Sequence, residues 1–89
     1  MVLKKACETR PDEASAWNNL GLSYFENEQF DEALSAYGLA IAKETTAVDE
    51  KNVNPEHLSF YYKNRGLAYY HLGEMGEAKR DYDDAIKLN

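Results

Sequence analysis

A residue pattern that occurs twice, 45 positions apart, constrains the fold of this 89-residue chain more than any other feature. The first copy spans Trp17 to Ala40, and the second spans Tyr62 to Ala85. Several equivalent positions hold the same residue in both copies: Gly21 and Gly66, Tyr24 and Tyr69, Ala33 and Ala78, Tyr37 and Tyr82, and Ala40 and Ala85. The chain is therefore expected to repeat one structural unit.

Apolar residues recur at three- and four-residue spacings, which is the pattern of amphipathic α-helices. We expect an all-α chain of about five helices, at residues 2–9, 13–27, 30–48, 55–72 and 75–88. The short polar breaks after residues 27 and 72 predict two antiparallel helical hairpins, because two to five residues are enough to join such helices.

Local signals indicate where these helices begin and end. Asn54 and Pro55 form a strong start signal, because asparagine caps a helix and proline fits its first turn. Asp12 and Asp31 are the expected caps of the helices that follow them. Gly73 suits a helix C-terminus. A glycine at the centre of an apolar stripe, such as Gly21, predicts the close approach of another helix, because it otherwise lowers helix propensity.

The spacing W-x2-L-G-x2-Y, then A-x3-F, A and P with a period of 34, is that of the tetratricopeptide repeat. The chain resembles this family at Trp17, Leu20, Gly21, Tyr24, Ala33 and Ala40, with Tyr37 for the phenylalanine. The second copy departs at Tyr62, for tryptophan, and at Arg65, for leucine. Pro11 matches the proline that closes a preceding repeat. The resemblance implies antiparallel helix-turn-helix repeats stacked as an α-solenoid.

The two copies lie 45 residues apart where the family has 34, so eleven extra residues lie between Ala40 and Tyr62. Val48 continues the third helix and Pro55 starts the fourth early, which favours two lengthened helices; a disordered bulge at residues 45–54 is the alternative. We divide the single domain, 1–89, into the last helix of a truncated repeat at 1–11, a repeat at 12–48, a loop at 49–54 and a second repeat at 55–89.

A second stripe on the first helix of each unit lies opposite the residues that face its hairpin partner. In the first unit this stripe comprises Ser15, Asn18, Asn19, Leu22, Phe25 and Glu26; in the second it comprises Phe60, Lys63, Asn64, Leu67, Tyr70 and His71. The resemblance implies that these stripes line a groove that binds an extended or helical peptide. Packing between repeats is the alternative for the apolar members.

Asn19 and Asn64 occupy equivalent places in the two stripes. Asparagine is a poor choice for a helix interior, but its amide both donates and accepts and so suits a peptide backbone. The resemblance implies that use, and a solvated side chain is the alternative. His71 closes the second stripe, as a hydrogen-bonding residue of the groove or as an exposed residue at the helix end.

One subgroup of the family grips the C-terminal carboxylate of chaperone tails with lysines, arginines and asparagines. Lys63 and Asn64 match parts of such a site. Leu22 and Leu67 stand where an asparagine would be wanted, and Phe60 stands where a lysine would be. The residues therefore disfavour a carboxylate ligand.

Composition excludes several other functions. The net charge of −6 disfavours binding to nucleic-acid phosphates, and no apolar run is long enough to span a membrane. His57 and His71 lack zinc-ligand spacing, and no nucleophile elbow or phosphate loop is present, so we expect no enzyme activity, cofactor or metal. A single cysteine, Cys7, favours a reducing location, in the cytoplasm or the nucleus.

The sequence therefore predicts an intracellular scaffold that binds a protein or a peptide. The alternative is a structural module that self-associates, because repeats bury their apolar sides only against neighbours. Ile86 and Leu88 have no following helix to meet, so a homodimer through the uncapped ends is the form this alternative takes.

Overall fold

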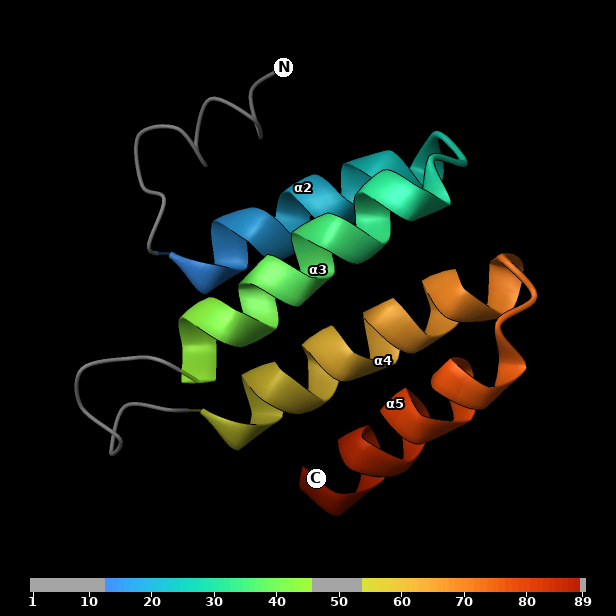
Figure 1. Cartoon of the computed structure of the whole chain (residues 1–89). Coiled ribbons are helices and arrows are strands. Elements are labelled where there is room, and N and C mark those ends of the chain that lie inside the picture. The colour runs from blue at the N-terminus through green and yellow to red at the C-terminus, as the bar shows by residue number, and fades with distance from the viewer. Residues whose placement is uncertain (1–12, 46–53, 89) are drawn as a thin grey trace.

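The computed structural model describes residues 13–45 and 54–88. These residues form four α-helices and no strand: α2 (Ala14–Glu26), α3 (Phe30–Thr45), α4 (Pro55–His71) and α5 (Met75–Leu88). Successive helices pack against each other with alternating direction (Figure 1). The predicted all-α fold is confirmed, and apart from the C-terminal end of α3 the described helix ends differ from the predicted ones by at most one residue. The predicted helix at 2–9 and the continuation over 46–48 lie outside the described residues.

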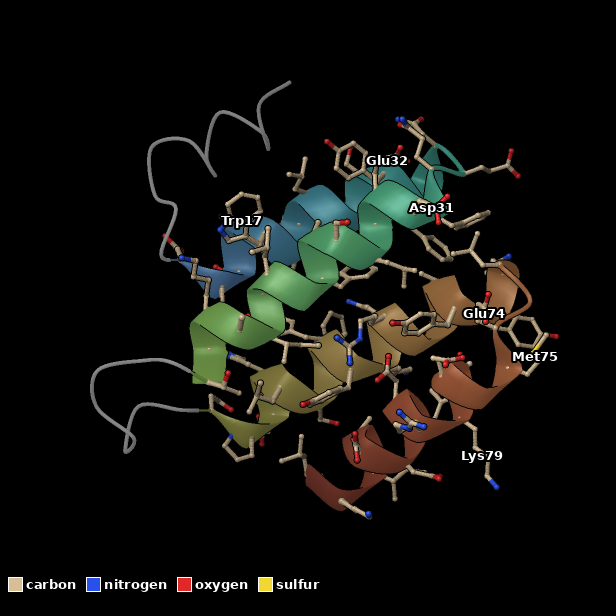
Figure 2. All side chains as sticks on the ribbon, viewed as in Figure 1. Trp17, Asp31, Glu32, Glu74, Met75 and Lys79 are labelled. Atoms are coloured by element: carbon tan, nitrogen blue, oxygen red, sulfur yellow. The ribbon has the colours of Figure 1, made fainter. Side chains whose placement is uncertain are left out.

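The capping signals predicted the start of α4 correctly and the cap of α3 wrongly. The Asn54 side chain accepts hydrogen bonds from the backbone N–H groups of Glu56, at 2.9 Å, and His57, at 3.3 Å, with Pro55 in the first turn as predicted. The prediction for Asp31 was wrong, because α3 begins one residue earlier, at Phe30. Asp31 lies in the first turn (Figure 2), where its carboxylate interacts favourably with the helix dipole. Asp12 lies outside the described residues.

Both hairpins close with the same turn. Glu28 and Gly73, which are 45 positions apart, both have a positive φ, of 61° and 81°. The next residue in each turn donates its N–H to a carbonyl of the first helix, Gln29 to Tyr24 and Glu74 to Tyr69, both at 2.9 Å. The left-handed residue reverses the chain, so that the second helix of each unit returns along the first.

Within each hairpin, a glycine allows the two helices to approach closely. A Cβ atom at Gly21 would lie 2.5 Å from Cε1 of Tyr37, and one at Gly66 would lie 3.2 Å from the carbonyl oxygen of Ala78. Any larger residue at Gly21 would have to move a tyrosine ring that is almost fully buried. The close approach that the sequence predicted at Gly21 is therefore confirmed.

The inner pair of side chains differs between the hairpins. In the first, Leu20 and Ala36 belong to one apolar cluster. At the equivalent positions of the second, Arg65 forms a bidentate pair with Asp81, with Nε–Oδ2 2.8 Å and Nη2–Oδ1 2.9 Å. The departure of Arg65 from the family pattern thus has its partner on α5, and the hydrogen bond to Asp81 raises the pKa of Arg65 despite partial burial.

Helix α4 joins the two hairpins by packing on the first one. Its residues Leu58 and Tyr61 contact a cluster that includes Ala40 and Ile41, and Ala68 contacts Tyr37. The main contact between hairpins is therefore that of α4 with α3, and a smaller one joins α4 to α2. This stacking places α2 and α4, the first helices of the two units, next to each other.

The ends of the α3–α4 connection are held together by Glu44. Its carboxylate accepts a hydrogen bond from the backbone N–H of Asn54 at 3.4 Å and lies 3.4 Å from Nδ1 of His57. Helix α4 begins at Pro55, one turn before Ser59, the position equivalent to the start of α2. The division of residues 46–53 between helix and loop lies outside the described residues and stays a prediction.

Candidate functional site

The twelve predicted site residues fall on two faces of α2 and α4, because consecutive helical residues are rotated by about 100°. One face carries Ser15, Asn19, Leu22 and Glu26 on α2, and Phe60, Asn64, Leu67 and His71 on α4; we call it the first-helix surface. The other face, which on α2 points toward the second unit, carries Asn18 and Phe25 on α2 and the equivalent residues Lys63 and Tyr70 on α4. Only the first face is common to both units as an open surface.

Asn18 is buried, and it lies between the two units. Its Oδ1 accepts a hydrogen bond from Nδ2 of Asn64 at 3.0 Å, across the contact of α2 with α4. We therefore remove Asn18 from the candidate site, because a ligand cannot reach a side chain that is covered by α4. The bond also orients the Asn64 amide, which keeps its carbonyl oxygen as an acceptor.

Phe25 and His71 belong to an aromatic cluster that ties the turn of the first hairpin to the end of α4. The imidazole of His71 stacks on the ring of Phe30 with a centroid distance of 4.9 Å, and Phe25 meets both rings edge-on at 5.2 Å. Tyr70 adds a further edge contact with His71 at 5.9 Å. Phe25 therefore packs between repeats, which was the alternative stated for the apolar residues.

Sequence reasoning did not include Phe30 in this cluster. The available signal was that Phe30 and its equivalent, Met75, are both apolar at the first position of their helices. Leu22 is likewise half-buried, beside the cluster formed by Ala33, Tyr37 and Ala68. Part of the predicted stripe of α2 is therefore buried by packing between the units.

The remaining residues of the first-helix surface are open to solvent. Ser15, Asn19 and Glu26 are exposed on α2, and Phe60 and Leu67 are exposed large apolar side chains on α4. The Ser15 hydroxyl donates to Oε1 of Glu13 at 3.0 Å. The surface thus combines apolar side chains with amides and one carboxylate, a composition suited to contacts rather than to bond-making chemistry.

Residues 13–45 and 54–88 contain no group of three or more His, Cys, Asp or Glu side chains placed to hold a metal ion. None of their helices has the length and apolar character required to cross a bilayer. The expectations of no cofactor and no nucleic-acid partner stay predictions.

Comparison with known proteins identifies the repeated unit. Models of the tetratricopeptide repeat match residues 14–44 and residues 59–89. The chain belongs to the tetratricopeptide repeat family. The two matched tetratricopeptide repeats begin 45 residues apart and correspond to the two hairpins, α2–α3 and α4–α5.

The curated relatives are longer proteins than this chain. The chain is 36% identical to the mitochondrial import receptor subunit TOM70 of Homo sapiens over 78 residues, which is 88% of this chain and 12% of the relative. It is 29% identical to the STIP1 homolog of Dictyostelium discoideum, over 99% of this chain and 19% of the relative. It is 25% identical to the Hsp70-Hsp90 organising protein of Plasmodium falciparum, over 85% of this chain and 16% of the relative. The chain thus spans less than a fifth of the length of each.

Proposed function

We propose that this chain is a protein-interaction scaffold whose first-helix surface binds a segment of another protein. Membership of the tetratricopeptide repeat family and the similarity to an import receptor and to an organiser of Hsp70 and Hsp90 support the general role. The exposed side chains of α2 and α4 support the location. No residue of this surface is assigned a catalytic role.

The exposure of Phe60 and Leu67 carries the proposal. These two side chains lie seven residues apart on one face of α4, which corresponds to about 10 Å along the helix axis. Phe60 is 50% exposed and Leu67 is 40% exposed, although nearby Leu58 and Ala68 are buried against the first hairpin. Adjacent exposed apolar groups favour a partner that covers them.

Amides flank these apolar groups and would serve the backbone of the bound segment. Asn19 is exposed on α2, and Asn64 on α4 is held in one orientation by its bond to Asn18. An amide that is already oriented loses little side-chain entropy on binding. The expected ligand is an extended segment with an apolar side chain over Phe60 and backbone groups facing the two amides.

The ligand is expected to bind through an internal segment rather than through its C-terminal carboxylate. The first-helix surface contributes Glu26 and the apolar residues Leu22, Phe60 and Leu67 where a carboxylate would require cations. Amidation of the C-terminus of a selected peptide should therefore leave its affinity unchanged.

Selection from a phage-displayed peptide library, followed by fluorescence anisotropy with the selected peptides, tests the proposal. Phe60→Ala should weaken binding about tenfold, as expected for an apolar contact at the centre of an interface. Asn19→Ala should weaken it about three- to tenfold, the usual value of one hydrogen bond. Met75→Ala is the matched control, because Met75 is 53% exposed and Phe60 is 50% exposed, but Met75 lies on the second hairpin's α5 (Figure 2).

Unchanged affinity for both variants would remove the first-helix surface as the binding site. If no peptide is selected and sedimentation shows a dimer at high protein concentration, the alternative function, self-association, replaces the proposed one. A monomer at high concentration that binds the selected peptides would exclude that alternative.

A further inference from the structure

The open polar groups of the first-helix surface are mainly hydrogen-bond acceptors. The Ser15 hydroxyl already donates to Oε1 of Glu13 at 3.0 Å, so it offers a ligand its lone pairs. The Asn64 amide donates to Oδ1 of Asn18 at 3.0 Å and keeps its carbonyl oxygen available. Glu26 is exposed, and an ionised carboxylate only accepts. A ligand of this surface must therefore supply donors.

A second exposed carboxylate extends this surface by one helical turn. Glu56 is exposed and lies four residues before Phe60, on the stripe of α4 that continues through Asn64. Helices α2 and α4 run in the same direction (Figure 1), so Glu56 lies near one end of the surface and Glu26 near the other. Neither carboxylate forms an ion pair within the residues that the structure describes. The surface thus carries a negative charge toward each end.

The distance between these ends sets the length of a matching ligand. Glu56 and His71, the α4 equivalent of Glu26, are 15 residues apart, which corresponds to about 22 Å along the helix axis. An extended chain advances about 3.3 Å per residue, so about seven residues span the same length. Phe60 lies one turn from Glu56, and Leu67 lies about two turns further on. The two exposed apolar side chains therefore lie between the two charges.

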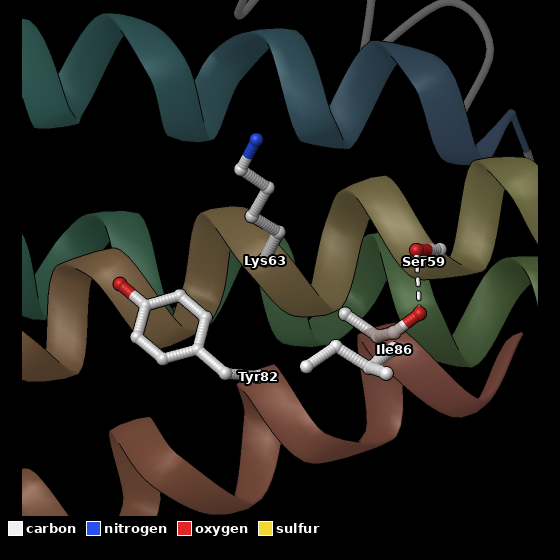
Figure 3. A pocket seen from close by; sticks show the side chains of 5 residues that line it. Ser59, Lys63, Tyr82 and Ile86 are labelled. Carbon is white, nitrogen blue, oxygen red and sulfur yellow. Dashed lines mark hydrogen bonds between the residues drawn. The ribbon is translucent and has the colours of Figure 1, made fainter. Parts of the chain in front are cut away.

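The lysine and arginine of α4 lie away from this surface, and α2 contains neither residue type. Arg65 is held by Asp81 in the bidentate pair inside the second hairpin. Lys63 lies on the adjoining face, where it lines a pocket of about 290 Å³ together with residues of α5 (Figure 3). The stripe between Glu56 and Glu26 therefore includes no lysine or arginine that would attract an acidic ligand.

We propose that the segment bound by the first-helix surface is basic, with a lysine or arginine toward each end and apolar residues between them. The cations pair with Glu56 and Glu26, and the apolar residues lie over Phe60 and Leu67. The inference rests on the proposed function, because it names the chemical class of that ligand. The net charge of −6 acts in the same direction, since it attracts a cationic segment before contact. An acidic segment would meet like charges at both ends and acceptors between them.

Three fluorescein-labelled peptides of eight residues with blocked termini test the proposal. All three have leucine at positions 3 and 6 and serine or alanine at the other inner positions, so that either chain direction matches the apolar pair. Positions 1 and 8 hold lysine in the first peptide, glutamine in the second and glutamate in the third. In anisotropy titrations at low salt, the lysine peptide should bind about tenfold more tightly than the glutamine peptide, about threefold for each exposed ion pair. The glutamate peptide should bind most weakly, and salt should reduce the differences.

Charge exchange at the two carboxylates assigns the preference to this surface. The double variant Glu26→Lys and Glu56→Lys should reverse the order, so that the glutamate peptide binds most tightly. The double variant Glu32→Lys and Glu77→Lys is the matched control, because it makes the same change of charge at exposed carboxylates of α3 and α5 and should keep the lysine peptide first. Circular dichroism checks that each variant folds. If the first variant does not, Glu26→Gln with Glu56→Gln should abolish the preference without adding charge.

Equal affinity for the lysine and glutamine peptides, or a preference for lysine that survives the exchange at Glu26 and Glu56, would overturn the proposal. Absence of binding by all three peptides, while peptides selected by phage display bind, would also overturn it. Phe60→Ala separates these outcomes from failure of the proposed function. If it weakens the glutamine peptide although no charge is preferred, the surface binds a segment and only the basic character is wrong. If Phe60→Ala leaves all three affinities unchanged, the binding site itself is wrong and the inference fails with it.

Discussion

At the scale of single residues, the two hairpins use inner pairs of opposite chemistry at the same positions. Leu20 and Ala36 form an apolar contact, whereas their equivalents Arg65 and Asp81 form a bidentate ion pair. Asp81 is buried, and the Arg65 guanidinium lies 5.5 Å from the ring centre of Tyr62. Exchange of partners would bury an unpaired charge against an apolar residue, so the pairs specify which helices form each hairpin.

Arg65→Leu should destabilise the fold by about 3–5 kcal/mol, because it leaves the buried carboxylate of Asp81 without a partner. Addition of Asp81→Ala should recover most of that loss, because the double variant recreates the pair found in the first hairpin. Urea unfolding of the four members of the cycle measures the coupling. Losses that simply add would show that the ion pair does not act as a unit.

At the scale of the elements, the turns of the two hairpins differ in the residue type at the position that adopts a positive φ. Glu28 adopts φ 61° at the position where the second turn has Gly73. A left-handed conformation costs a residue with a side chain about 1–2 kcal/mol, whereas glycine adopts it freely. The first turn is therefore strained relative to the second, although both make the same backbone hydrogen bonds.

Glu28→Gly should stabilise the protein by about 0.5–1 kcal/mol, the relief of strain less the added entropy of glycine in the unfolded chain. Glu28→Ala keeps the strain and serves as the control, because it removes the same exposed carboxylate. Thermal unfolding compares the three proteins. If Glu28→Ala stabilises the protein as much as Glu28→Gly does, the gain comes from loss of the carboxylate charge rather than from relief of backbone strain.

At the scale of the whole molecule, the packing of one hairpin on the other gives equivalent residues different solvent exposure. Tyr37 is 1% exposed beneath α4, and burial, followed by the charge of Glu26, raises its pKa to about 12. Tyr82, at the equivalent position on the open face, is only half-buried, and burial is the main cause that raises its pKa as well. The stacking of hairpins, rather than the motif, decides how deeply each tyrosine lies.

The raised pKa of Tyr37 predicts a loss of stability at alkaline pH. The unfolded chain releases the phenolic proton near pH 10, before the folded chain does, so the contribution is complete below pH 10 and is lost as the pH rises toward 12. The full difference is roughly 2–3 kcal/mol. Urea unfolding at rising pH should show a smaller decline for Tyr37→Phe than for the unsubstituted protein. Tyr82→Phe is the matched control, and equal declines for all three proteins would contradict the prediction.

Much of this molecule could be predicted from local signals. The 3.6-residue period, the Asn54–Pro55 start and Gly73 located the helices to within a residue of their described ends, except at the C-terminal end of α3. The predicted stripe could not be divided in the same way. Asn18 and Asn19 are neighbours with the same side chain, yet only Asn18 is covered by α4. The stacking of His71 on Phe30 joins residues far apart in the chain and left no signature in the periodicity.

The repeat of 45 residues by itself determined the helices, their pairing into hairpins and the membership of a family, because these depend on residues close together in the chain. Only the tertiary structure decided which face of each unit stays open. Ile41 and Ile86 occupy the same place in the same motif, and one is covered while the other is exposed. Burial depends on what packs against a residue, and among the described residues α4 covers the first hairpin while none of them covers the second.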